Sequence, residues 1–217
     1  MSSRTALSPQ ARLLSSAVLL LAFALRLWAI DARSLWFDEA YEYWSAVVPP
    51  GALPATVMTS FQPPLYSYLL HIWLRFGDHA VWLRWLSVAF SLVGVAGMVR
   101  LGRRWLGVRG AAIAGLVWAT LPPQVKYAQE VAEYALLSAL LVWLLAALAQ
   151  AVDAGRWRDW MGWGLAAALA VYSHYGAAVV VLALSLTLFV QHAWQRRTAA
   201  LVKQGAVSLG ALLLGIP

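Results

Sequence analysis

The sequence has no cysteine and few charged residues, and each shortage removes a class of function. Without a thiol, the chain of 217 residues has neither disulfides nor thiolate chemistry. Charged types make up only 12% of the chain, whereas hydrophobic types make up 62%, and the mean hydropathy is +0.70. A water-facing globule of this size cannot bury that much apolar surface. The composition therefore predicts an integral membrane protein.

Acidic residues are especially scarce, because nine Asp and Glu stand against sixteen Lys and Arg, which gives a net charge of +7. A positive charge of this size also occurs in nucleic-acid-binding proteins. Here, however, the basic residues lie in short clusters between apolar runs, as membrane topology requires. We therefore expect membrane lipids around the chain and no nucleic-acid partner.

Seven apolar segments predict an all-α, polytopic membrane protein with about seven transmembrane helices. The segments are 13–30, 81–101, 108–122, 134–152, 160–172, 176–194 and 199–216. A full span takes roughly 17–25 residues, so the third and fifth are short. Pro122 and Pro123 end the third segment, because proline cannot continue helical backbone bonding. The first lacks a small-residue cleavage pattern and predicts a span rather than a signal peptide.

Basic residues predict the orientation of these spans. Eleven of them precede the first span or lie in every second loop after it: Arg4, Arg12, Arg100, Arg103, Arg104, Arg109, Arg156, Arg158, Arg196, Arg197 and Lys203. The alternate loops hold only Arg33, Arg75 and Lys126. The positive-inside rule then places the N-terminus in the cytoplasm. Loops 31–80, 123–133 and 173–175 share the exoplasmic side.

The first exoplasmic loop, 31–80, is too long for a simple connector, and long ordered loops are usually functional. Two helices are predicted within it. One covers 39–48 after Asp38 and ends at Pro49-Pro50-Gly51, and the other covers 64–76 and ends at Gly77. The second rises only about 20 Å, which is too short to span a bilayer. We expect both helices to lie in the membrane interface.

Asp38 and Glu39 follow the first span directly, and carboxylates at a membrane face suit proton transfer or cation binding. Helical spacing places Asp38 and Glu42 on one face and directs Glu39 away from both. The alternative is that Asp38 is only an N-cap, with Glu39 and Glu42 favoured by the helix dipole.

Two more polar groups lie in the other exoplasmic loops. Tyr127, Glu130 and Tyr134 follow Lys126 at a spacing that places them on one side of a helix opening the fourth span. The alternative is an ordinary helix start with interfacial tyrosines. His174 lies between the fifth and sixth spans, and a lone histidine there is most often just a hydrogen-bonded residue. All three groups nevertheless fall on one predicted side of the membrane.

Short motifs occur in a definite order along nearly the whole chain. They are Arg26-Leu27-Trp28, Leu35-Trp36-Phe37-Asp38-Glu39-Ala40, Gln62-Pro63-Pro64-Leu65-Tyr66, Phe76-Gly77-Asp78, Leu83-Arg84-Trp85-Leu86-Ser87, Gly102-Arg103-Arg104, Tyr127-Ala128-Gln129-Glu130 and Tyr134-Ala135-Leu136. This ordered set resembles the GT-C membrane glycosyltransferases. The nearest pattern is the family-39-like branch, which includes protein O-mannosyltransferases and lipid A aminoarabinose transferases.

The resemblance implies inverting transfer of a sugar from a polyprenyl phosphate to a lipid, glycan or protein acceptor. It implies Asp38 as the catalytic base, with Glu39 supporting it or binding a divalent cation, Mg²⁺ or Mn²⁺. The predicted substrate-binding residues form two groups. Tyr127, Glu130 and Tyr134 shape the sugar pocket, and Arg84, Lys126 and His174 contact the donor phosphate.

Two positions depart from the family pattern. Gln62, also counted with the substrate-binding residues, stands where a histidine is usual. Ala132 replaces an arginine that would be a phosphate partner.

The resemblance also predicts one transmembrane module over 1–217 that continues in a longer protein, in the bacterial inner membrane. Two alternatives remain. A transporter or flippase would need paired repeats with broken helices, and no repeat is evident. A non-catalytic module that binds lipid or a partner would agree with the missing arginine at Ala132.

Overall fold

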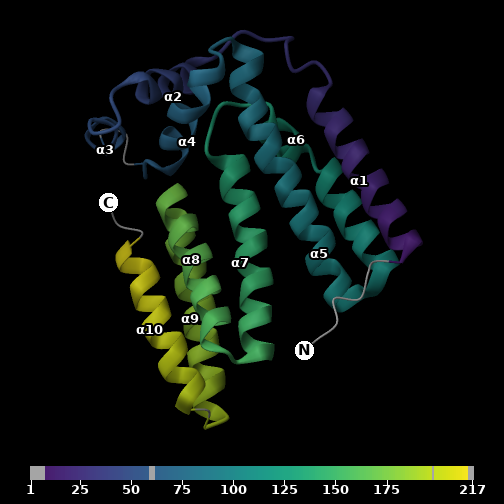
Figure 1. Cartoon of the computed structure of the whole chain (residues 1–217), viewed down its shortest axis with the longest axis vertical. Helices are drawn as coiled ribbons and strands as arrows, with labels where there is room; N and C mark the ends of the chain where they lie inside the picture. Colours follow the sequence, from purple (N-terminus) through teal and green to yellow (C-terminus); the bar gives the residue numbers. More distant parts are fainter. Residues whose placement is uncertain (1–7, 59–61, 197, 215–217) are drawn as a thin grey trace.

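The computed structural model describes residues 8–58, 62–196 and 198–214, and within these ranges the chain forms helices and loops without a β-strand. The long helices run side by side, and the short helices α2 to α4 lie across one end of them (Figure 1). The helices are α1 (Pro9–Leu27), α2 (Phe37–Val47), α3 (Leu53–Met58), α4 (Leu65–Trp73), the 3₁₀ turn η1 (Leu74–Phe76), α5 (Ala80–Thr120), α6 (Pro122–Ala128), α7 (Tyr134–Ala154), α8 (Trp157–Ser173), α9 (Gly176–Trp194) and α10 (Thr198–Leu214).

Helix α5 covers the second and third predicted apolar segments and reverses direction at Gly107. This residue has φ 68° and ψ −169°, a backbone conformation that is essentially restricted to glycine. The two halves then pack closely, since a Cβ on Gly115 would lie 2.4 Å from Cγ2 of Val99. Small residues of this kind let helices approach within a membrane. The expected break between two helices is therefore present, as a hairpin.

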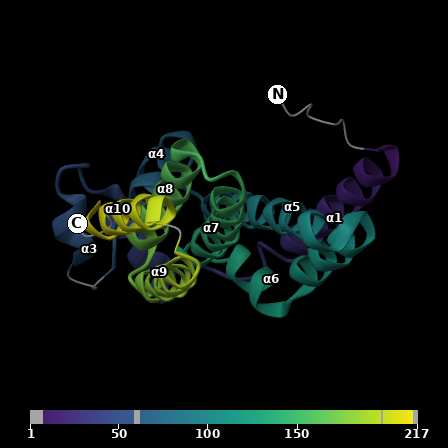
Figure 2. The same ribbon diagram turned by 90° about the horizontal axis from the view of Figure 1, so that it is seen from below.

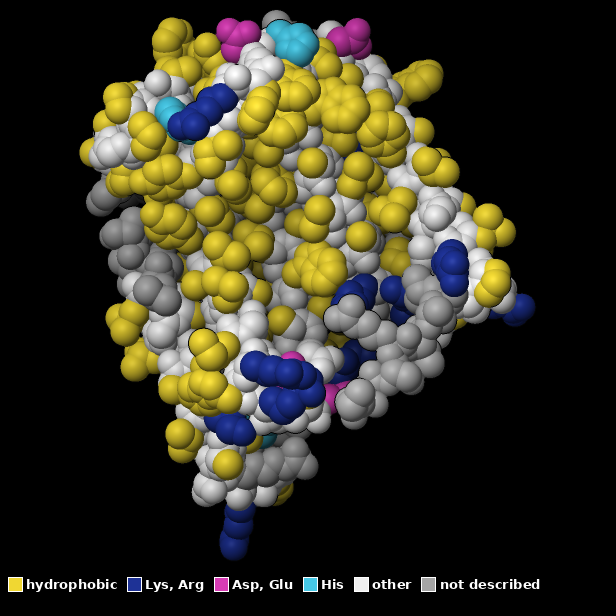
Figure 3. All heavy atoms as spheres, in the orientation of Figure 1, with side chains coloured by type: hydrophobic (Ala, Val, Ile, Leu, Met, Phe, Trp, Pro, Cys, Tyr) yellow, Lys and Arg dark blue, Asp and Glu magenta, His cyan; other side chains and the backbone are white. Residues whose placement is uncertain are grey.

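Within the described residues, each of the seven predicted apolar segments lies mainly on a helix. Among the described residues, α1, α5, α7 and α9 are long and apolar enough to cross a membrane, whereas α8 and α10 have 17 residues each. Figure 3 shows a broad hydrophobic surface around the middle of the molecule. The chain is an integral membrane protein, and the full number of spans stays a prediction.

The bundle is organised around α7. Figure 2 shows α1, α5 and α6 on one side of α7 and α8 to α10 on the other. On the first side, Val18 and Ala22 of α1 pack against Val95 and Val99 of α5. On the second side, a buried apolar cluster that includes Trp160 contains residues of α7, α8, α9 and α10.

The short helices cover the end of the bundle where α5 begins. Tyr66 and Leu70 of α4 pack with Ala46 of α2, Leu83 of α5 and Val131 in a buried cluster. Helices α2 and α4 confirm the two helices predicted in loop 31–80, whereas α3 was not predicted. In Figure 3 most Lys and Arg side chains lie toward the opposite end of the molecule, as the topology prediction requires.

Candidate active site

The acidic motif lies at the start of α2, and the structure corrects two expectations about it. The helix begins at Phe37 with Trp36 as its N-cap residue, so the N-cap alternative for Asp38 is wrong. Glu39 and Glu42 are both buried, whereas Asp38 is exposed. The prediction that Glu39 points away from Glu42 is therefore also wrong, and Asp38 is the accessible carboxylate.

Glu39 forms a buried ion pair with Arg84, at the start of α5. The Oε1 atom of Glu39 accepts from Nε of Arg84 at 2.9 Å, and Oε2 accepts from Nη2 at 2.8 Å. The same oxygens accept the backbone N–H groups of Val131 at 3.0 Å and Trp36 at 3.3 Å. The carboxylate therefore joins α2 and α5 to the turn before α7.

The Arg84 guanidinium is fully occupied by this arrangement. Besides the two bonds to Glu39, Nη1 donates to the carbonyls of Ile30 at 2.7 Å and Arg33 at 2.9 Å, and Nη2 donates to the carbonyl of Ser34 at 3.2 Å. A guanidinium has five N–H donors, and all five are used. Arg84 therefore has no free N–H for a donor phosphate, and this arrangement does not support the prediction that it contacts one.

A cation at Glu39 does not fit this site. Both carboxylate oxygens already accept two hydrogen bonds each, while Mg²⁺ needs near-octahedral oxygen ligands. In the described ranges, no group of three or more His, Asp and Glu side chains has the arrangement of a metal site. Glu39 is instead placed to support neighbouring segments.

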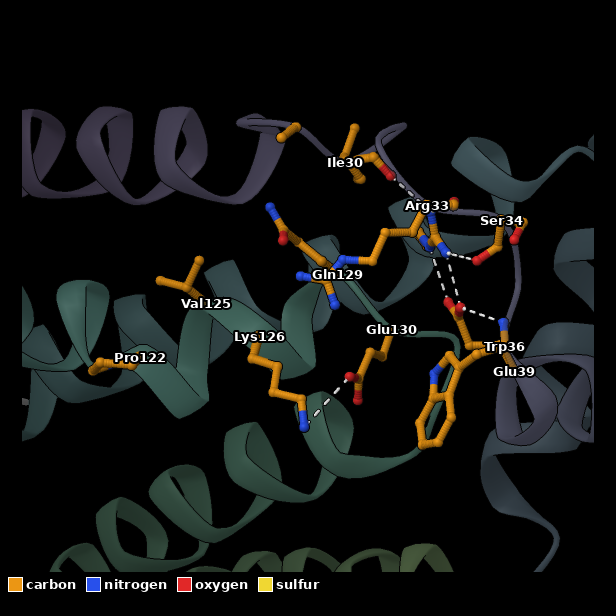
Figure 4. Close-up of a pocket in the computed structure, with 12 residues that line it drawn as sticks. Ile30, Arg33, Ser34, Trp36, Glu39, Pro122, Val125, Lys126, Gln129 and Glu130 are labelled. Atoms are coloured by element: carbon orange, nitrogen blue, oxygen red, sulfur yellow. Dashed lines mark hydrogen bonds and ion pairs between the residues drawn. The ribbon is translucent and has the colours of Figure 1, made fainter.

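A cavity of about 680 Å³ opens beside the ion pair (Figure 4). Its walls come from the segment between α1 and α2, from the helices α2, α5 and α6, and from the turn after α6. The lining residues are Ala29, Ile30, Arg33, Ser34, Trp36, Glu39, Arg84, Pro122, Val125, Lys126, Gln129 and Glu130. One part of the wall is apolar, and another carries both acids and bases. Such a combination suits an amphipathic ligand with a charged head.

Two cations in the cavity wall have donors to spare. Lys126 lies with Nζ 3.7 Å from Oε1 of Glu130 and over the ring of Tyr127, at 5.4 Å from its centre. Arg33 is exposed, and its side chain makes no hydrogen bond or ion pair within the described parts of the chain. Sequence reasoning used Arg33 only as a topology signal. Its position five residues before the acidic motif Asp38-Glu39 could have suggested more.

The aromatic residues come together, but not in the predicted way. Residues 129–133 form a turn between α6 and α7, so Tyr127, Glu130 and Tyr134 do not line one helix, and that prediction is wrong. The turn still brings the rings of Tyr127 and Tyr134 to 4.7 Å. The His174 ring lies 6.4 Å from Tyr134, and its Nδ1 accepts the N–H of Gly176 at 2.9 Å. His174 thus lies behind Tyr134 and outside the cavity wall.

Two buried carboxyl groups behind Asp38 were not predicted as site residues. Burial, assisted by Glu133 and Asp38, raises the pKa of Glu42 to about 8, although Ser67 donates to Oε2 at 3.2 Å. Burial also raises the pKa of Glu133, against the effect of His174, and its Oε1 has no hydrogen-bond partner. The sequence gave no signal for these two residues, because their pKa values depend on burial in the folded protein.

Glu130 connects the cavity to this acidic region. Burial raises the pKa of its carboxyl, and Lys126 and Arg33 oppose the shift. Glu39 and Asp38 add to the rise. Asp38, Glu130 and His174 thus belong to neighbouring groups at one end of the bundle, although only Glu130 lines the cavity. Gln62 is half-buried before Pro63 and does not line it.

Comparison with known proteins identifies the family of the chain. A search of curated proteins and a search of solved structures gave no significant match. A family model described as dolichyl-phosphate-mannose-protein mannosyltransferase matches residues 61–217, which include α4 to α10, Arg84 and Glu130. The match begins after Asp38 and Glu39. Because it covers well over half of the chain, the chain belongs to this family of membrane glycosyltransferases, of the GT-C type.

Proposed function

We propose that this protein transfers a sugar from a polyprenyl-phosphate donor to an acceptor hydroxyl at the exoplasmic face, with inversion. The observation that carries the proposal is the cavity, because its wall changes from apolar residues to paired charges. Ala29, Ile30, Pro122 and Val125 suit a prenyl chain, and Lys126 suits the phosphate. The family name supports a lipid-linked sugar as the donor.

In this proposal Asp38 is the general base. It accepts the proton of the acceptor hydroxyl, whose oxygen attacks the anomeric carbon of the sugar. The bond from that carbon to the phosphate oxygen breaks, and its electron pair stays on the departing polyprenyl phosphate. Phosphate is a good leaving group at neutral pH and needs no acid. Exposure of Asp38 fits contact with an acceptor arriving from water.

The remaining residues bind and orient the reactants. Tyr127 and Tyr134, whose rings lie 4.7 Å apart and are tilted by 41°, flank Glu130 in sequence and are proposed to bind the sugar beside the cavity. His174 is proposed to hold Tyr134 in place rather than to touch the phosphate. Orientation of this kind supplies much of the rate of a bimolecular transfer.

Replacing the proposed base tests the function. Purified protein with a polyprenyl-phosphate mannose and a panel of hydroxyl acceptors should show transfer, measured as polyprenyl phosphate released. Asp38→Asn is expected to lower kcat about 10²–10⁴-fold, with donor affinity nearly unchanged. Asp31→Asn, a second exposed acid of the same loop, serves as the matched control.

Three outcomes separate the alternatives. Equal turnover by Asp38→Asn and wild type would show that another group is the base. Donor binding without turnover, for every sugar and acceptor, would favour the non-catalytic lipid-binding module suggested by Ala132. Absence of both binding and turnover would contradict the proposal as a whole.

A further inference from the structure

The departing phosphate needs cationic partners, and of the basic residues expected to contact it only Lys126 lines the cavity with donors to spare. Ala132 occupies the position where the family pattern has an arginine, and it is buried. All five N–H donors of Arg84 form hydrogen bonds with Glu39 and three backbone carbonyls. A second cation beside Lys126 must therefore come from a residue that was not predicted to contact the phosphate. This inference rests on the proposed function.

The backbone of segment 30–34 is fixed by Arg84. Its guanidinium donates to the carbonyls of Ile30, Arg33 and Ser34 at 2.7, 2.9 and 3.2 Å. Three carbonyls of five consecutive residues thus converge on one buried cation. These bonds anchor the backbone of the loop, and the Cα of Arg33 is anchored with it.

The side chain of Arg33 extends from this anchored backbone into the cavity wall (Figure 4). Within the described ranges it makes no hydrogen bond or ion pair, yet it is close enough to oppose the rise in the pKa of Glu130. Lys126 approaches Glu130 from α6, at 3.7 Å. Two cations from separate walls therefore flank one carboxylate in the cavity.

We propose that Arg33 binds the donor phosphate together with Lys126, and that the Arg84–Glu39 pair positions Arg33 for this role. A sugar phosphodiester carries one negative charge, and the released polyprenyl phosphate approaches two. Two cations can balance the second charge as the sugar–oxygen bond breaks, so that no proton has to be transferred to the phosphate. The guanidinium fork matches two phosphate oxygens at once, whereas an ammonium acts as a point charge.

Binding of a short-chain polyprenyl phosphate, compared with the uncharged polyprenol of the same length, tests Arg33 without requiring turnover. Arg33→Gln is expected to weaken polyprenyl phosphate binding at least about tenfold and to leave polyprenol binding and the unfolding temperature unchanged. Arg33→Lys should fall between wild type and Arg33→Gln. Arg75→Gln replaces another exposed arginine of the same loop that is absent from the cavity wall and should match wild type.

Arg84→Lys tests the positioning part. A lysine can keep a charge near Glu39 but cannot hold three carbonyls and two carboxylate oxygens in one plane. If the fold survives, as judged by unchanged polyprenol binding, the affinity for polyprenyl phosphate should fall as it does in Arg33→Gln. An Arg84→Lys variant with normal polyprenol and polyprenyl phosphate binding would overturn the positioning role.

The phosphate role of Arg33 has its own contrary results. Equal polyprenyl phosphate affinity in Arg33→Gln and wild type would overturn it, and so would equal losses of phosphate and polyprenol binding, which indicate a structural role. A charge-specific loss in Arg33→Gln, in a protein that transfers no sugar, would support the phosphate site while the proposed transfer fails.

Discussion

Two ion pairs, one at each end of the helical bundle, differ in burial and in the segments that they join. At the α2 end, Arg84 and Glu39 are 4% and 1% exposed and lie 45 residues apart in sequence. At the other end, Arg156 is 51% exposed and pairs at 2.7 Å with Asp159, three residues along the first turn of α8. The first pair joins separate segments and shapes a cavity. The second can stabilise only its own helix turn.

The cavities at the two ends also differ in the charged residues of their walls. The cavity at the α2 end has Glu39 and Glu130 in its wall beside its cations. A smaller cavity of about 390 Å³, between α7 to α10, is lined by Arg196 and Lys203 and has no carboxylate in its wall. Of these two cavities, the first alone combines carboxylates with cations in its wall, as we expect for the proposed glycosyl transfer. Charge at a membrane face thus indicates function when it is buried, mixed in sign and shared between segments.

Breaking the buried pair should have the largest effect. Glu39→Gln leaves the Arg84 guanidinium buried without a counter-charge, which typically costs about 3–5 kcal/mol. We expect a large drop in the thermal unfolding temperature of the detergent-solubilised protein, followed by tryptophan fluorescence. Asp31→Asn is the control, because Asp31 is exposed. An unfolding temperature unchanged in Glu39→Gln would show that the pair does not hold the outer segments together.

Glu42 is a buried acid with no ion-pair partner among the described residues, and it should make the stability of the α2 end depend on pH. Its pKa is raised from an ordinary value near 4.5 to about 8, chiefly by burial and then by Glu133. Between these values the folded state keeps a proton that the unfolded state has released, so stability falls as pH rises, by at most about 1.4 kcal/mol per pH unit. Ser67 and Asp38 also face this carboxyl.

Glu42→Gln should remove this contribution, because glutamine does not titrate. Unfolding temperatures measured from pH 5 to pH 8 should fall less steeply in the variant than in wild type. Burial also raises the pKa of Glu133, so part of the slope remains. Parallel curves for the two proteins would contradict the raised pKa of Glu42.

The reversal of α5 at the opposite end should respond more weakly. Gly107→Ala forces a side chain onto φ 68° and ψ −169°, a conformation that costs roughly 1–3 kcal/mol, although nothing lies within 4 Å of the added Cβ. The unfolding temperature should fall by less than in Glu39→Gln. Gly162→Ala, also with open space around the added Cβ but within α8, is the matched control and should not fall. Equal values for both variants would show that the hairpin tolerates the strain.

The helices themselves could be predicted from the sequence, because their signals are local. Long apolar runs identify the helices of the bundle, and Pro49-Pro50-Gly51 and Gly77 correctly end α2 and the α4–η1 segment. The family motifs also identified membership correctly, as the match over residues 61–217 shows.

The site was predicted less well, because its geometry depends on contacts between distant residues. The turn at 129–133 looks helical by spacing, yet the N–H of Val131 bonds to Glu39, 92 residues away. The partner of Arg84 likewise lies outside its own segment, so its five occupied donors could not be foreseen. Asp38, by contrast, was selected for its place after the first span, and that selection stays a prediction.

The exposed pair should show the smallest effect of all. Asp159→Asn removes the partner of Arg156, but that arginine remains in contact with solvent, so no charge becomes buried and unpaired. Side-chain entropy and salt screening offset most of what an exposed pair contributes. The unfolding temperature should therefore match wild type within error, at low and high salt alike. A loss approaching that of Glu39→Gln would mean that local pairs at this end also support the fold, and that burial is not what separates the two ends.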